Sequence, residues 1–166
     1  MSLELKELML RGPRLTLAVA ESMTSGRVQA AVGAISGASE FFLGGVTAYS
    51  LEEKVKLLGV DRAAAEKVNC VSAEVVEQMA RGVCRLFGSD FGVATTGYAE
   101  RSPVWSVTEP MAWWAVARRD AGGALIVKTG HVEFPGATRI EAQTRVAEAT
   151  LAALVAELRE LREREG

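Results

Sequence analysis

Three short polar segments carry hydroxyl, amine and glycine groups in patterns that could bind an anion or an oxyanion. The first is Ala-Glu-Ser-Met-Thr-Ser-Gly at residues 20–26, between an apolar run and a helical pattern. Its hydroxyls and the backbone N–H groups around Gly26 would face an anion at the start of the helix. Taken alone, this segment has a simpler interpretation, in which Ser22 or Thr24 caps the helix.

The second segment is Tyr-Ser-Leu-Glu-Glu-Lys at residues 49–54, which contains a helix start. Ser50 and Glu53 have the spacing of a capping box, which accounts for Glu53 without a catalytic role. Lys54 falls in the first turn, where the positive end of the helix dipole disfavours a charged ammonium group. This position predicts a lowered pKa for Lys54, as a lysine base requires, although a solvated surface lysine is the common alternative.

The third segment is Thr-Thr-Gly at residues 95–97, after an apolar run. Gly97 permits a sharp turn after a strand, and Thr96 could bond a ligand or satisfy that turn. Sites in open α/β sheets form at the carboxyl ends of strands, so we expect the three segments to meet there. The side chains expected to converge on one pocket are Ser22, Tyr49, Lys54 and Thr96.

Hydrophobic spacing predicts a chain in which strands and helices are mixed throughout. Strands are predicted at residues 15–20, 46–49, 91–95, 111–117 and 124–134. Helices are predicted at residues 3–10, 24–35, 50–59, 62–67, 72–88 and 138–164. The turn residues between the last two strands indicate a hairpin, so the sheet is mixed. We expect an α/β fold of three layers, with helices on both faces of an about five-stranded sheet, as one domain over residues 1–166.

Some side chains are expected in particular layers. Leu86 is placed on the inward side of its helix, and the charged turns at residues 159–165 are expected to project into solvent. Trp113 and Trp114 are adjacent on a predicted strand, so they point to opposite faces of the sheet. Only one can face its own core, and the other needs a helix layer or a partner subunit. This pair therefore favours a homodimer.

Charge and composition exclude several classes of function. The chain has 19 basic and 21 acidic residues and a net charge of −2, so no nucleic-acid partner is expected. Cys70 and Cys84 are isolated and His131 is the single histidine, so no metal site is expected and both cysteines are interpreted as core residues. No apolar run reaches the ~20 residues that cross a bilayer, and residues 1–14 do not form a signal peptide. We therefore expect a cytoplasmic protein with no membrane partner.

Together and in this order, the motifs resemble the CinA C-terminal family, and the likeness covers almost the whole chain. The matching segments are A-E-S-x-T-x-G at residues 20–26, F-x-G-G-V-x-x-Y-S-x-E-x-K at 42–54, L-L-G-V at 57–60, V-S-x-E-V at 71–75, T-G at 96–97 and F-P-G at 134–136. The chain as a whole, residues 1–166, is identified as one CinA C-terminal-like domain.

The resemblance implies an amidohydrolase that converts nicotinamide mononucleotide, a small-molecule nucleotide, to nicotinic acid mononucleotide and ammonia, without a metal or other cofactor. It implies that Ser22 is the nucleophile and Lys54 its base, and that Tyr49 and Thr96 orient or polarise the reacting groups. A Ser-Lys pair agrees with a chain whose single histidine is unsuited to a triad. The resemblance places substrate contacts, including candidate oxyanion N–H groups near residues 25 and 26, at Glu21, Thr24, Ser25, Gly26, Gly97, Arg101 and Arg139. It also implies a homodimer.

The segment from Glu100 to Val107 departs from the family pattern, which usually reads T-G-x-A-G-P followed by further glycines. Glycines let backbone N–H groups approach a phosphate, whereas Glu100 would repel one, and Arg101 could replace part of the contact. We expect this loop to lie partly over the site mouth, with Arg101 or Trp105 nearest the pocket. Two functions therefore stay open: an active amidohydrolase with an altered substrate, or a catalytically silent paralogue that binds a nucleotide or a partner protein.

Overall fold

Five strands form one mixed sheet in the computed structural model, which describes residues 1–166. The strands are β1 (Leu17–Glu21), β2 (Phe42–Thr47), β3 (Phe91–Tyr98), β4 (Met111–Arg119) and β5 (Leu125–Glu133). Their order in the sheet is β2-β1-β3-β4-β5. β1 runs parallel to β2 and β3, whereas β3, β4 and β5 pair antiparallel. The predicted mixed α/β sheet is confirmed.

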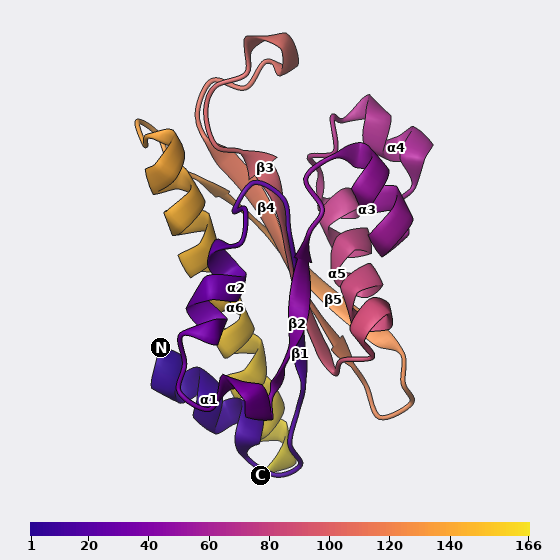
Figure 1. Cartoon of the computed structure of the whole chain (residues 1–166), viewed down its shortest axis with the longest axis vertical. Helices are drawn as coiled ribbons and strands as arrows, with labels where there is room; N and C mark the ends of the chain where they lie inside the picture. Colours follow the sequence, from indigo (N-terminus) through magenta and orange to yellow (C-terminus); the bar gives the residue numbers. More distant parts are fainter.

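Helices cover both faces of this sheet (Figure 1). One face carries α1 (Ser2–Leu10), α2 (Arg27–Gly33) and α6 (Arg139–Glu165). The other face carries α3 (Leu51–Leu58), α4 (Arg62–Lys67) and α5 (Ala73–Phe87). The three predicted layers are therefore present, and none of the six helices is both long and apolar enough to span a membrane.

The strand β1 lies at the centre of the fold, and all five of its residues are buried. Its side chains alternate between the two cores, because successive residues of a strand point to opposite faces. Leu17 and Val19 pack in the core under α1, α2 and α6. Ala18 and Ala20 pack in the core under α3, α4 and α5. The carboxyl end of β1 is thereby fixed between two packed helix layers.

Helix ends follow the capping residues of the sequence. The Ser50 side chain accepts a hydrogen bond from the Glu53 N–H at 3.3 Å, and the Ser72 side chain accepts one from Val75 N–H at 3.1 Å. Thr138 and Glu141 form a reciprocal capping box at the start of α6. These caps fix where α3, α5 and α6 begin, which is why their predicted starts agree with the structure within a residue.

The tryptophan pair lies on β4, and both rings find neighbours within the chain. Trp114 packs against the core under α6, whereas Trp113 packs against the core on the α5 side. Trp113 also lies against His131 of β5, with 4.8 Å between ring centroids. The two rings therefore point to opposite faces as expected, and of the two alternatives for the second ring the structure shows a helix layer of the same chain.

Four other expectations are corrected by the structure. The strand expected at residues 46–49 runs from Phe42 to Thr47, because it pairs with β1 over that range. The helix expected from residue 24 begins at Arg27, because residues 22–26 form turns. The strand expected to end at Thr95 continues to Tyr98, because β4 pairs with it along its whole length. Leu86, expected to face inward, is 48% exposed near the end of α5.

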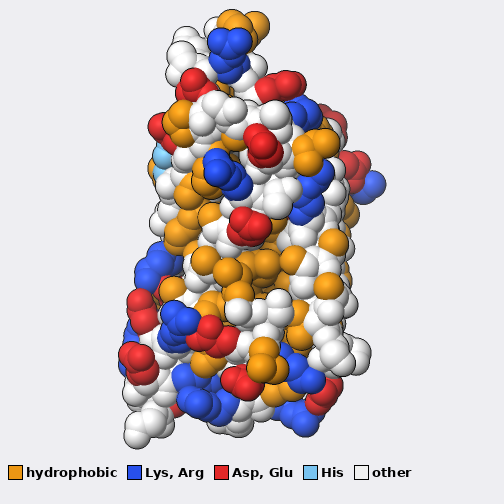
Figure 2. Space-filling view, turned by 90° about the vertical axis from the view of Figure 1, so that its left-hand side faces the viewer, with side chains coloured by type: hydrophobic (Ala, Val, Ile, Leu, Met, Phe, Trp, Pro, Cys, Tyr) orange, Lys and Arg blue, Asp and Glu red, His pale blue; other side chains and the backbone are white.

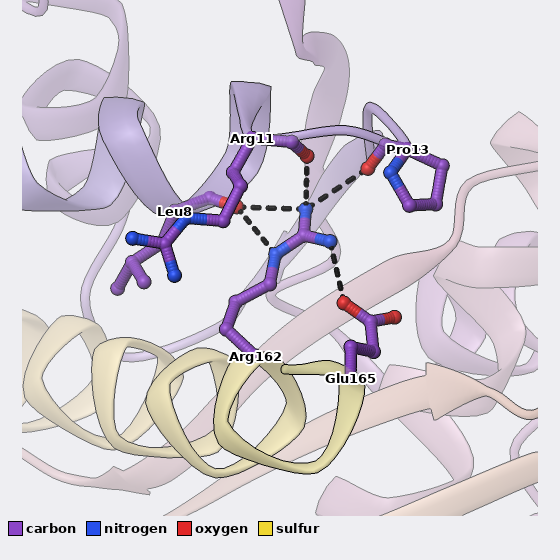
Figure 3. Close-up of polar contacts among 5 residues, drawn as sticks. All are labelled: Leu8, Arg11, Pro13, Arg162 and Glu165. Atoms are coloured by element: carbon purple, nitrogen blue, oxygen red, sulfur yellow. Dashed lines mark hydrogen bonds and ion pairs between the residues drawn. The ribbon is translucent and has the colours of Figure 1, made fainter.

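The charged end of α6 does not simply project into solvent, because Arg162 is buried (Figure 3). Its guanidinium group donates hydrogen bonds to the backbone carbonyls of Leu8, Arg11 and Pro13, at 2.7 to 3.0 Å. It also pairs with Glu165 at 2.8 Å. Carbonyls at a helix C-terminus lack intrahelical partners and attract cations. Arg162 therefore joins the end of α6 to the end of α1.

Candidate active site

The three polar segments of the sequence meet at the carboxyl ends of β1, β2 and β3. They line a pocket of about 350 Å³. Because these three strands are parallel and adjacent, their carboxyl ends lie at one edge of the sheet. The structure brings together all four side chains expected to converge, which are Ser22, Tyr49, Lys54 and Thr96.

Ser22 and Lys54 are in direct contact at the base of this pocket. The Lys54 ammonium group donates to Ser22 Oγ at 2.9 Å, and both residues are buried. Lys54 also donates to the Tyr49 backbone carbonyl at 2.7 Å. Burial lowers the pKa of Lys54 from 10.5 to about 8, with a weaker opposite effect from Cys70. Lys54 therefore loses its proton much closer to physiological pH than an exposed lysine does, and the neutral form can accept a proton from the Ser22 hydroxyl.

A buried network fixes the turn that carries Ser22. The Glu21 carboxylate accepts hydrogen bonds from the N–H groups of Val28 and Gln29, at 2.8 and 3.0 Å. It also accepts from the hydroxyl of Thr24 at 2.6 Å. Glu21 and Thr24 are fully buried, so they hold the start of α2 behind the pocket and do not line it. Glu21 and Thr24, expected to contact the substrate, therefore stabilise the turn that carries Ser22.

The remaining residues of this turn differ in the backbone groups that they leave available. Ser25 is exposed, and its N–H donates to the Ser22 carbonyl at 3.0 Å, so it is not available to an oxyanion. Gly26 directly precedes α2 with a positive φ of 95°, a conformation that favours glycine, and it does not line the pocket. Met23 lines the pocket, and its N–H donates to no group of the chain. The role of Met23 could not be predicted from the sequence, because nearly every residue type has a backbone N–H donor.

Tyr49 acts through two different atoms. Its backbone carbonyl accepts from Lys54, whereas its phenol oxygen accepts from the Arg139 guanidinium group at 3.0 Å. The Tyr49 side chain is half-exposed and forms one wall of the pocket. Tyr49, expected to orient or polarise the reacting groups, thus contacts the lysine through its backbone carbonyl.

The opposite wall of the pocket comes from the turn before α5 and from β3. The Thr96 hydroxyl donates to the Cys70 carbonyl at 2.6 Å. Asn69, which donates to the Tyr98 hydroxyl at 3.0 Å, and Cys70 both have positive φ angles, of 48° and 62°. Cys70, expected in the core, is only partly buried and lines the pocket, whereas Cys84 is buried as expected. The position of Cys70 could not be predicted from residue type, because it depends on the conformation of the turn.

Gly97 lies inside β3 and not in a turn after it. A Cβ atom at this position would lie 2.4 Å from the Met111 carbonyl oxygen of β4. Only glycine therefore allows the two strands to approach this closely beside the pocket. Gly97 therefore lines the pocket as expected, but glycine is required there by the close approach of β4 and not by a turn.

The pocket continues outward into two further hollows. One of about 210 Å³ shares Met23, Tyr49 and Gly97 with the pocket and is also lined by Arg101 and Arg139. The next, of about 390 Å³, contains the same two arginines together with the turn before α6. These hollows place both expected arginines at the mouth.

The altered loop forms a projecting arm from the ends of β3 and β4 (Figure 1). Further along the arm, Ser102 and Val107 pair through two backbone hydrogen bonds of 3.0 Å, which close the tip at residues 103–106. Arg101 lines the mouth as expected, but Trp105 lines neither the pocket nor the two adjoining hollows. The base of the loop, at Glu100 and Arg101, therefore lines the hollows next to the pocket, while its tip extends beyond the sheet.

Metal-binding groups do not gather in this structure: no three side chains of His, Cys, Asp or Glu are close enough to share an ion. His131 lies on β5 and does not line the pocket.

Comparison with known protein families shows the family of this chain. The model of the CinA C-terminal domain matches residues 3–158. The chain belongs to the CinA C-terminal domain family. Among curated CinA-like proteins, the one from Chlorobium limicola is 37% identical over 145 residues, which is 86% of this chain and 33% of that protein. The one from Synechococcus is 52% identical over 90 residues, or 54% of this chain and 22% of that protein.

Solved structures of CinA superfamily proteins have the same fold. The competence-damaged protein superfamily member from Enterobacter cloacae has a TM-score of 0.83 and 25% identity, over 95% of this chain and 89% of that one. The competence damage-inducible protein A from Klebsiella pneumoniae has a TM-score of 0.82 and 29% identity, over 95% and 94%. The chain spans about a third or less of the length of the curated CinA-like relatives that it matches.

Proposed function

We propose that this CinA-like chain is a cytoplasmic amidohydrolase that hydrolyses nicotinamide mononucleotide, or a related amide, to the acid and ammonia. The observation that carries the proposal is the 2.9 Å contact between Ser22 Oγ and a buried Lys54 whose pKa is lowered to about 8. A neutral amine in contact with a serine hydroxyl has the arrangement of a nucleophile and its base. The family resemblance supports the choice of amide.

In the first step, neutral Lys54 takes the proton of the Ser22 hydroxyl while Ser22 Oγ bonds to the amide carbon. Lys54 keeps one N–H directed at the Tyr49 carbonyl, which leaves its lone pair free for Ser22. The N–H of Met23 is available to the oxyanion that forms.

In the second step, the tetrahedral intermediate loses ammonia, which leaves with the proton that Lys54 returns. The product of this step is an ester between the acyl group and Ser22. Water then attacks this ester with Lys54 again as base, which releases the acid and restores the Ser22 hydroxyl. The outer hollows would hold the rest of the substrate, toward Arg101 and Arg139.

The test is ammonia release from nicotinamide mononucleotide and a small panel of related amides. We expect Ser22→Ala and Lys54→Met each to lower kcat/KM by at least about a thousandfold, because nucleophile and base act as one unit. Ser39→Ala and Lys56→Met are matched controls, since both residues are exposed and lie outside the pocket. Full turnover by either pocket variant would refute the Ser-Lys assignment.

A catalytically silent protein that binds a nucleotide or a partner protein is the second candidate. One observation favours a loss of activity: the Arg139 guanidinium group, expected to contact the substrate, is already paired with Glu100 at 2.9 Å, so part of the expected substrate contact is occupied within the chain. A purified chain that bound the nucleotide but released no ammonia from any amide of the panel would favour this alternative.

A further inference from the structure

A bridge of three side chains crosses the mouth of the Ser22 pocket. Arg139 at the start of α6 donates from one guanidinium nitrogen to Glu100 at 2.9 Å and from the other to the Tyr49 hydroxyl at 3.0 Å. Glu100 follows β3, and Tyr49 follows β2, so the bridge joins three separate segments. It closes one side of the hollow that connects the pocket with the outside.

The charges around this bridge balance. The outermost hollow is lined by the carboxylates of Glu100 and Glu109 and by the guanidinium groups of Arg101 and Arg139. Glu109 accepts a hydrogen bond from the Gly136 N–H at 2.9 Å, so its charge is held at the wall. A substrate phosphate entering this hollow would meet two negative and two positive side chains, whose formal charges sum to zero.

Glu100 makes with Arg139 the contact that a phosphate would make. Carboxylate and phosphate oxygens both accept hydrogen bonds from the planar donors of a guanidinium group. Glu100 and Arg139 are both exposed, so their pairing is weak enough for a phosphate to displace it. The displaced carboxylate would still lie near the phosphate and repel it, because Glu100 is tethered beside the hollow.

We propose that Glu100 is a specificity-determining residue that substitutes for a substrate phosphate at Arg139. The site therefore takes pyridine carboxamide nucleosides, which lack a phosphate, at least as well as the corresponding nucleotides. The identity of the reacting amide rests on the proposed function, whereas the competition between Glu100 and a phosphate for Arg139 does not.

A binding experiment tests the competition without any turnover. Ribose 5-phosphate is titrated against the wild-type chain, Glu100→Gln and Glu109→Gln, with phosphorus NMR as the readout and ribose as the phosphate-free comparison by proton NMR. We expect Glu100→Gln to bind ribose 5-phosphate about tenfold more tightly and ribose equally, because one like charge is removed from the anion site. Glu109→Gln removes the same charge from the same hollow but not from Arg139, so its gain should be about threefold or less.

A double variant assigns the gain to the arginine. Replacing Arg139 by Gln in the Glu100→Gln background should remove the tighter binding of ribose 5-phosphate. Equal affinity of the wild-type chain and Glu100→Gln for ribose 5-phosphate would overturn the proposal, and so would a gain that survives the loss of Arg139.

Turnover extends the test to the substrate class. We expect the wild-type kcat/KM for nicotinamide riboside to equal or exceed that for nicotinamide mononucleotide. Glu100→Gln should raise only the mononucleotide value, by about tenfold. If no variant releases ammonia while the binding gain is present, the proposed function fails and the role of Glu100 stands. If both amides react and Glu100→Gln changes neither their ratio nor the binding, the role of Glu100 is wrong.

Discussion

At the scale of single residues, Lys54 determines how activity should depend on pH. Burial lowers its pKa to about 8, and the proposed base must be neutral. We expect kcat/KM to rise about tenfold per pH unit below pH 8 and to level off above it. A pH profile of ammonia release measures this limb. A profile that rises to pH 10 and beyond would mean that Lys54 titrates like an exposed lysine.

The same burial predicts a gain in stability when Lys54 is removed. The unfolded chain holds the Lys54 proton up to a pKa near 10.5, whereas the folded chain loses it near 8, so the wild-type fold is destabilised below that range. We expect Lys54→Met to raise the free energy of unfolding by about 1–3 kcal/mol at pH 7. The gain should fall to about zero by pH 10.5, as the wild type recovers stability.

Urea denaturation at pH 7 and pH 10 measures this difference. Lys56→Met is the control, because Lys56 lies on the same helix and is exposed, and its effect should be within about 0.5 kcal/mol at both pH values. If Lys54→Met destabilised the fold at pH 7, the hydrogen bonds of Lys54 would outweigh the effect of its burial.

Some parts of this site could be predicted from residue types, and others could not. Ser22, Tyr49, Lys54 and Thr96 could be predicted, because each lies beside a strand end in a motif with a defined spacing. The N–H of Met23 and the carbonyl of Tyr49 could not, since every residue has these groups. The family resemblance places Glu21 at the substrate. Its hydrogen bonds to α2 depend on the conformation of the turn and could not be predicted from the sequence.

At the scale of elements, predictions succeeded where a local signal marks an end. The two ends of α5 were predicted correctly, because Ser72 caps its start and Gly88, with a positive φ, ends it. The length of β3 could not be predicted, because the polar residues after Thr95 are held by pairing with β4. The burial of Arg162 could not be predicted for a similar reason, since the carbonyl that it contacts belongs to α1, about 150 residues earlier in the chain.

The arm between β3 and β4 gives a prediction at this scale. Val104 is 88% exposed at its tip, and Trp105 does not line the pocket or its two adjoining hollows. Replacing residues 103–106 by Asn-Gly should preserve the pairing of Ser102 with Val107, because this dipeptide favours a two-residue hairpin turn. We expect the kcat/KM of ammonia release to stay within about twofold of wild type.

A loss of more than about tenfold in the shortened chain would mean that the tip reaches the substrate. In that case Trp105→Ala alone should reproduce the loss if ring stacking is responsible.

At the scale of the whole molecule, layers are easier to predict than association. Alternating strands and helices indicate three layers, because each sheet face needs a cover. The two tryptophans were a poor guide to a partner, since both are covered within the chain. Figure 2 shows a different feature, apolar side chains across the middle of the face on which α2 and α6 lie, with charged side chains toward both ends.

We propose that the chain forms a homodimer through this face. Ala31 on α2 and Ala152 on α6 are both exposed within one chain, so a charge at either position should spare the fold. We expect the mass of a dimer for the wild type at micromolar concentration, and of a monomer for Ala152→Glu, by light scattering. Ala63→Glu, on exposed α4 of the opposite face, should remain a dimer. A monomer mass for the wild type would exclude the homodimer.

The positions of the two chain ends have a practical consequence for handling the protein. Both chain ends lie in the lower half of Figure 1, whereas β1, β2 and β3 end above them. A purification tag or an immobilising linker on either terminus would therefore extend away from the Ser22 pocket. A sensor surface that holds the chain by either end should leave the mouth open to a ligand in the flowing solution.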